Sequence, residues 1–133
     1  SNICLDWDEI LQLDHHPLIT IGAHSHSHPV LALEDIKKAR DEIIKAKLIL
    51  EKRLGHSVVH FAYPFGSTKD AGPREYQLAR ECGFKTATTT RCYPASLARI
   101  HSLPRYGFEQ NSAVGDINSR ILGLSNSLGL QLA

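Results

Sequence analysis

The feature that most constrains the fold is a long amphipathic stretch at residues 33–55, LEDIKKARDEIIKAKLILEKRLG. Six apolar residues recur in it at spacings of three and four, which is the period of one helix face. They are Ile36, Ala39, Ile43, Ala46, Leu50 and Leu54. Acidic residues at its start, basic residues at its end and Gly55 beyond it are typical signals of helix ends. Because a helix must bury its apolar stripe against another layer, the chain needs a sheet or further helices.

Short β-branched and aromatic runs flank this predicted helix. LITIGAH at 18–24 precedes it, SVVHFAYP at 57–64 follows it, and FKTATTT comes later at 84–90. A second helix is predicted at 73–82, because a proline suits its first turn and a glycine follows its end. Alternating strands and helices favour an α/β fold with a parallel sheet, in which ligands gather beyond the carboxyl ends of the strands.

Weaker signals fill the rest of the chain. Apolar residues at helical spacing predict one short helix over 3–13 and another over 113–124, and the region between 91 and 112 is expected to be loop with an extended piece near Leu103. A chain of 133 residues is the size of one domain. We therefore expect a single domain over 1–133, weakly defined after about residue 110.

Composition argues against several classes of protein. The net charge of +1 and the 22% of charged residues are ordinary, and no basic patch indicates nucleic-acid binding. No apolar run approaches the roughly 20 residues of a membrane helix, and this chain shows no signal-peptide pattern at its start. The three cysteines lack CxxC spacing, so neither a disulfide framework nor a cysteine zinc site is expected.

Histidine is the unusual component, because five of the eight histidines lie between positions 15 and 28. His24 and His28 follow a predicted strand four residues apart, so a turn between them would direct both imidazoles at one cation. His26 is expected to point elsewhere. Alternatively, Ser25 or Ser27 caps a turn and the histidines lie in solvent. Spacing alone leaves both interpretations open.

Combined with the motifs that follow, this segment resembles the polysaccharide deacetylase family, also called carbohydrate esterase family 4 or the NodB homology domain. The His-Ser-x-x-His-Pro of IGAHSHSHPVL resembles the second motif of the family, and FAYPFG resembles the third. AGPREYQLARECGFKTATTT is similar to the next helix and strand, and LPRY at 103–106 to a later segment. The resemblance covers most of residues 5–108 and implies a partial (β/α) barrel of the NodB type, with parallel strands and crossover helices.

The resemblance also implies a chemistry. Family members hold a divalent metal, usually zinc, with an aspartate and two histidines, and a metal-activated water removes acetyl groups from N- or O-acetylated sugars. His24 and His28 would be the metal ligands here, with cobalt, nickel or manganese as other possible ions. The backbone N–H of Phe65 would face the oxyanion. Acetylated polysaccharide or oligosaccharide would be the partner, and a bacterial periplasmic or extracellular parent protein would be typical.

Other candidates carry less specific signals. Tyr63, Pro64, Phe65 and Arg105 are candidates for substrate binding, although the aromatic rings suit a core equally and the arginine suits an ion pair. His101 is a candidate general acid, with a loop histidine as the alternative.

The sequence departs from the family pattern in one major respect. The first motif, which supplies the metal-binding and catalytic aspartates, is lacking, and Asp6, Asp8 and Asp14 lie on a predicted helix. Ala62 stands where many members have an arginine. Since a closed eightfold barrel takes about 250 residues, we expect the C-terminal part of a longer deacetylase. It would be weak or inactive alone, and the metal would be absent unless an aspartate is supplied.

Two alternatives to a catalytic fragment stay open. One is a non-catalytic module that binds a glycan or a metal through the strand-end face. The other is a truncated fragment that only self-associates. On any of these interpretations a partial barrel exposes a sheet edge and half a core, so we expect a homo-oligomer joined through that edge, which would be one way to complete the barrel.

Overall fold

The computed structural model describes residues 4–107 and 113–121, and helices alternate with short strands along the first of these ranges. The elements are helices α1 (Trp7–Asp14), α2 (Ile36–Leu54), α3 (Pro73–Glu81) and α4 (Val114–Ile121), strands β1 (His60–Ala62) and β2 (Thr86–Thr88), and 3-10 turns at Leu31–Leu33 and Leu97–Arg99. All four predicted helices are confirmed within the described residues. Position 3, positions 122–124 and most of the tail after 110 lie outside them.

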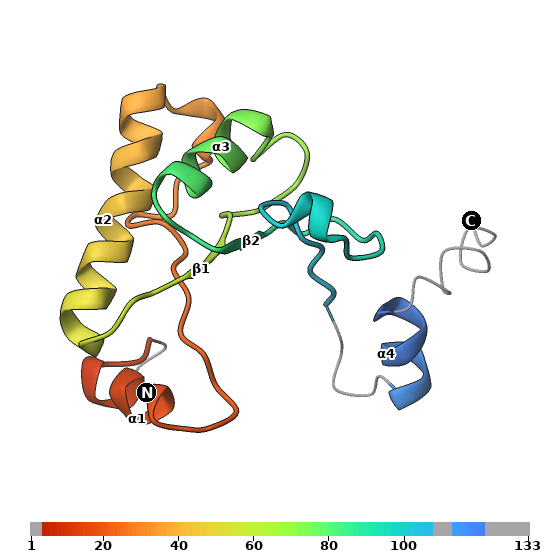
Figure 1. Ribbon diagram of the computed structural model, residues 1–133, viewed down its shortest axis with the longest axis horizontal. Coiled ribbons are helices and arrows are strands. Elements are labelled where there is room, and N and C mark those ends of the chain that lie inside the picture. The colour runs from red at the N-terminus through yellow and green to blue at the C-terminus, as the bar shows by residue number, and fades with distance from the viewer. Residues whose placement is uncertain (1–3, 108–112, 122–133) are drawn as a thin grey trace.

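A parallel sheet forms the centre of the fold (Figure 1). Strands β1 and β2 pair in parallel, with Phe61 opposite Ala87. Two single-residue bridges extend the sheet, from Ala23 to Phe61 on one side and from Thr88 to Leu103 on the other, and both are parallel. Four segments therefore lie side by side in chain order, which confirms the predicted α/β class. The sheet does not close on itself in the described part of the chain, and it corresponds to part of a barrel.

The strands are shorter than the sequence predicts. Only Ala23 of the run 18–24 pairs with a neighbour, and β1 and β2 are three residues each. Leu18 is 89% exposed, because no described segment covers the start of that run. A strand is defined by the partner with which it pairs, so the apolar residues before Ala23, which pair with no described segment, form no strand.

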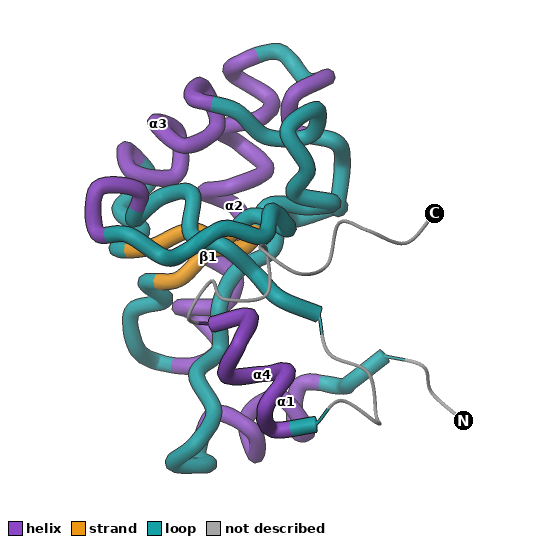
Figure 2. The backbone as a smooth tube through the Cα atoms, turned by 90° about the vertical axis from the view of Figure 1, so that its right-hand side faces the viewer, coloured by secondary structure: helices purple, strands orange, loops and turns teal. Residues whose placement is uncertain are grey.

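Helices α2 and α3 pack together on one side of this sheet, as Figure 2 shows with the strands in orange. Phe61 and Ala87 point toward the helices and are buried with Ile43 of α2 and Leu78 of α3. Alternate strand residues face the other side, where exposed His60 lies with its Nδ1 2.7 Å from the Thr86 hydroxyl. The helix side is therefore an apolar core and the opposite side is polar.

The ends of α2 are fixed by its own sequence. The Asp35 carboxylate accepts a hydrogen bond from the Lys38 N–H at the first turn, and Gly55 ends the helix with a left-handed φ of 77°. Helix α2 runs from the carboxyl end of the sheet, near His24, to the amino end, near His56.

No helix of the described residues has the length and apolarity needed to cross a membrane.

Candidate functional site

The two predicted metal ligands lie together at the carboxyl end of the Ala23 segment. The Nε2 atoms of His24 and His28 are 3.1 Å apart, and their rings meet edge to face. Two nitrogens bound to one zinc ion at about 2.0–2.1 Å, with an angle of about 90–110° between them, would be separated by about 2.9–3.4 Å. The spacing of this pair therefore fits two positions of one coordination sphere.

A backbone carbonyl fixes the His24 ring. Its Nδ1 lies 2.7 Å from the Ala62 carbonyl oxygen, and since that oxygen can only accept, Nδ1 carries the proton. The pKa of His24 lies below its usual value, mainly because of the partial burial of the ring, against which the bond to Ala62 acts, with smaller contributions from the charges of His28 and Arg105. The ring is therefore held neutral with the Nε2 lone pair free, which is the form that binds metals.

Two side chains hold the loop that joins the histidines. The Ser25 hydroxyl accepts a hydrogen bond from the His28 N–H at 3.0 Å, so this serine does cap a turn, as one interpretation of the sequence expects. The Glu42 carboxylate of α2 accepts hydrogen bonds from the N–H groups of His26 and Ser27 and from the Ser27 hydroxyl. Burial alone would raise the pKa of Glu42, but these hydrogen bonds lower it.

Phe65 lies beside the pair, just after β1. The Gly66 N–H donates to the Pro64 carbonyl at 2.6 Å, which closes a three-residue turn around Phe65 at a φ of 59°. The Phe65 ring is 53% exposed and stands edge to face against the His28 ring, with centroids 4.9 Å apart. Its N–H has no hydrogen-bond acceptor among residues 4–107 and 113–121, so this donor is available to a ligand.

The end of the neighbouring strand supports that turn. The Thr90 hydroxyl donates to the Phe65 carbonyl at 2.8 Å, and the Thr90 N–H donates to the Gly66 carbonyl at 3.0 Å. A Cβ on Gly66 would lie 2.8 Å from the Thr90 nitrogen, so only glycine fits this close approach. The turn is locked between β1 and the segment after β2.

Backbone strain is concentrated at this site. In the part of the chain that the structure describes, the non-glycine residues with positive φ are Ser25, His28 and Phe65. Each such residue costs on the order of 1–3 kcal/mol, and strain of this kind gathers at functional sites. The strained residues are the two ends of the histidine loop and the residue whose ring touches it.

Two of the substrate-binding candidates lie in the core. Tyr63 is fully buried, packs against Phe61 and Tyr76, and donates its hydroxyl proton to the His101 carbonyl at 2.8 Å. Burial raises the pKa of its phenol. Pro64 is also fully buried. In this position neither side chain offers a surface to a substrate.

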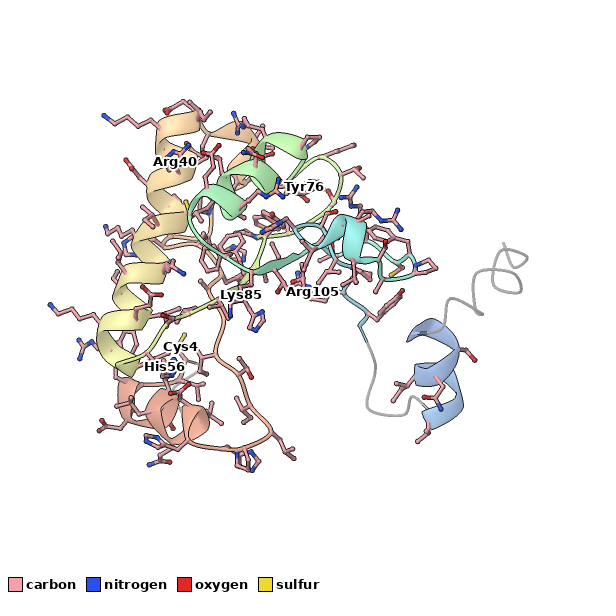
Figure 3. The ribbon with its side chains drawn as sticks, viewed as in Figure 1. Cys4, Arg40, His56, Tyr76, Lys85 and Arg105 are labelled. Carbon is pink, nitrogen blue, oxygen red and sulfur yellow. The ribbon has the colours of Figure 1, made fainter. Side chains whose placement is uncertain are left out.

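His101 makes its contact away from the histidine pair, whereas Arg105 lies nearer to it. The Nε2 of His101 lies 2.8 Å from the Phe84 carbonyl, at the amino end of β2, so this contact gives no support to a general-acid role. Arg105, labelled in Figure 3 on the segment that follows the Leu97–Arg99 turn, is exposed. Its charge contributes to the lowered pKa of His24.

Acidic residues do not complete a metal site within the described residues, where no three metal-binding side chains come together. Asp6 caps α1, and Asp14 lies 2.7 Å from the His56 ring near the amino end of the sheet. The described residues therefore fit two of the three protein ligands that the family resemblance implies, His24 and His28. Sequence reasoning missed Glu42 and Thr90, since a single acidic or hydroxyl residue carries no motif.

Comparisons with known proteins identify the family and the fold. The family model described as polysaccharide deacetylase matches residues 1–87, which is well over half of the chain. No curated protein matches the sequence significantly.

Several solved structures share the fold. The deacetylase PplD of Streptococcus pyogenes, solved in complex with acetate, has a TM-score of 0.78 at 22% identity and is matched over 88% of this chain and 50% of its own. A polysaccharide deacetylase of Bacillus cereus has a TM-score of 0.71 at 21% identity, over 88% of this chain and 36% of its own. IcaB of Ammonifex degensii has a TM-score of 0.64 at 20% identity, over 90% of this chain and 51% of its own. The chain thus spans about half or less of these structures, and at such identities the likeness concerns the fold.

Proposed function

This chain belongs to the polysaccharide deacetylase family, and from that premise we propose that it is the histidine-bearing part of a metal-dependent domain that removes acetyl groups from carbohydrate. The observation that carries the proposal is the 3.1 Å separation between the Nε2 atoms of His24 and His28. This separation suits two ligands of one ion, and the Ala62 carbonyl fixes the His24 ring with its Nε2 directed at the Nε2 of His28.

His24 and His28 would hold a divalent metal, with zinc the first choice and cobalt, nickel or manganese also suited to imidazole and carboxylate ligands. Such a metal, when bound, makes its water a nucleophile at neutral pH and polarises the acetyl carbonyl. The carboxylate ligand and the catalytic base would come from outside the described residues.

The chain's own contribution to the transition state would be the Phe65 N–H, which donates to the oxygen of the acetyl group as negative charge develops there. The Thr90 contacts hold that turn still, so little reorganisation accompanies the reaction. Arg105, exposed beside His24, would contact a polar or anionic group of the sugar.

With two of its ligands only, the chain alone is expected to be weak or inactive. We further propose that residues 1–133 act as one partial domain and that the unpaired edge of the sheet at 18–22 promotes association with a second copy or another segment. Sedimentation analysis tests the association, because a purely monomeric profile contradicts it.

The direct test measures acetate release from acetylated chito-oligosaccharides, with and without added Zn²⁺ or Co²⁺. We expect slow, metal-dependent release that the His24→Ala substitution abolishes. His26→Ala is the matched control, because the hydrogen bond of His26 to Glu42 comes from its backbone N–H, which alanine keeps, and it should retain the activity. Fast turnover by the unmodified chain would refute the claim that it lacks part of the catalytic site. Turnover that needs neither metal nor His24 would refute the proposed metal site.

A non-catalytic glycan-binding module is the second candidate, which the exposed Phe65 ring favours because sugars stack on such rings. Calorimetric titration with the same oligosaccharides separates the two. Binding that needs Phe65 but neither metal nor His24 supports the module, and a flat trace removes it.

A further inference from the structure

Glu42 lies in the first half of α2, and its side chain reaches the loop between the two predicted metal ligands. Its Oε2 accepts hydrogen bonds from the N–H groups of His26 at 3.1 Å and Ser27 at 2.7 Å. Its Oε1 accepts a hydrogen bond from the Ser27 hydroxyl at 2.8 Å. Both oxygens of the carboxylate are therefore committed to this loop.

The loop needs such an attachment because its own backbone is strained. Ser25 and His28 have φ values of 62° and 60°, a left-handed conformation that L-residues avoid. The Ser25 hydroxyl bonds the His28 N–H, but this contact lies within the loop and does not attach it to the rest of the fold. Glu42 supplies that attachment from α2, which is itself fixed to the core by its buried residues Ala39, Ile43 and Ala46.

We infer that Glu42 is a positioning residue, which holds the 25–28 loop so that the Nε2 atoms of His24 and His28 converge before a metal binds. The inference rests on the proposed function, since it gives Glu42 this purpose only if the two histidines bind a metal. A ligand set that is ordered in advance binds its ion more tightly, because the free protein has already lost the freedom of the loop.

Hydrogen exchange of the backbone amides tests the attachment without any metal. In Glu42→Ala, the amides of His26 and Ser27 should exchange about tenfold faster or more, while the amides of α3 keep their protection. Asp41→Ala is the matched control, because it removes an exposed carboxylate from the neighbouring position of the same helix. It should leave the exchange of both loop amides unchanged.

Titration with Zn²⁺, followed by the imidazole NMR signals of the full chain, tests the consequence for binding. The dissociation constant at His24 and His28 should rise about 10- to 100-fold in Glu42→Ala, which is the range typical of residues that orient metal ligands. It should stay within about twofold in Asp41→Ala. Glu42→Gln keeps one acceptor oxygen and should fall between the wild type and Glu42→Ala. The Co²⁺ absorption spectrum should broaden in the same order.

The outcomes separate the two claims. If His24→Ala abolishes Zn²⁺ binding while Glu42→Ala changes neither the loop amides nor the affinity, Glu42 does not position the histidines. Faster loop exchange with unchanged affinity overturns the inference too, since the contact would then be structural only. If His24→Ala leaves Zn²⁺ binding intact, the proposed function fails instead. Should Glu42→Ala not fold, Glu42→Gln decides, and an unchanged affinity in it counts against the inference.

Discussion

At the carboxyl end of the sheet His24 faces another histidine, whereas at the amino end His56 faces the carboxylate of Asp14. The first ring loses charge, because partial burial lowers its pKa, and the second gains charge, because the hydrogen bond with Asp14 raises its pKa. The neutral form of histidine is therefore favoured at one end of the sheet, and the charged form, paired with a carboxylate, is favoured at the other. Environment, and not residue type, thus decides which histidine is suited to bind a metal.

The largest expected effect separates the two ends by metal binding. His28→Ala removes one of the two converging nitrogens, so the Zn²⁺ affinity of the pair should fall about a hundredfold or more. His56→Ala removes a ring that is already engaged with a carboxylate and should change the affinity by less than about twofold. Zn²⁺ titration followed by calorimetry measures both. Equal losses in the two variants would break the comparison.

The second-largest effect concerns how well the backbone at each end of the sheet tolerates a Cβ atom in place of a glycine hydrogen. Gly66→Ala forces a Cβ to 2.8 Å from the Thr90 nitrogen at a φ of 72°, whereas Gly83→Ala meets nothing within 4 Å at a φ of 80°. Both carry the left-handed penalty of about 1–2 kcal/mol, and only the first adds a clash. The free energy of unfolding should therefore fall by about 2–4 kcal/mol in Gly66→Ala and by about 1 kcal/mol in Gly83→Ala. Urea denaturation measures this difference, and similar losses would mean that the Phe65 turn can relax.

The smallest effect separates the ends by pH. His56 has a raised pKa, so its contribution to stability is complete below about pH 6.5 and is lost as the pH rises through the raised value. His24 has a lowered pKa, so its contribution is present above about pH 6.5 and is lost as the pH falls through the lowered value. An NMR titration should place the midpoint of His56 above that of His24.

Asp14→Asn provides the control for this titration. It removes the partner charge, so the midpoint of His56 should move down toward its ordinary value of about 6.5 while that of His24 stays in place. If His24 moved with it, the two ends would be coupled and the comparison would need revision.

How far the sequence predicts this fold depends on how local each cause is. Helix α2 is predicted almost to its ends, because its apolar period and Gly55 act within the helix itself. The strands are predicted too long, because pairing depends on neighbours that sequence does not show. Tyr63 shows what the sequence could still decide. It follows Phe61 by two residues, and residues two apart in extended chain share one face, so its burial agrees with the core interpretation that the sequence left open.

The site shows the same division. The His24 and His28 pair is predicted by the family motif His-Ser-x-x-His after a strand, since spacing alone left a solvent interpretation open, and that motif is a local pattern. Glu42 and Thr90 act across the fold, from a helix and from a neighbouring strand end, so their roles follow only from the arrangement of the elements. The family resemblance, drawn from motifs in one stretch of chain, is confirmed by the match over residues 1–87.

The left-handed residues of the site have a consequence for protein engineering. Glycine would adopt the conformations of Ser25, His28 and Phe65 without strain, so a search for thermostable variants would favour glycine at these positions. Each such substitution would remove the loop hydroxyl of Ser25, the imidazole proposed as a metal ligand at His28, or the exposed ring of Phe65. Selection for stability alone would thus erase the site while it preserved the fold, and a stabilised version of this domain should be screened for metal binding at every round.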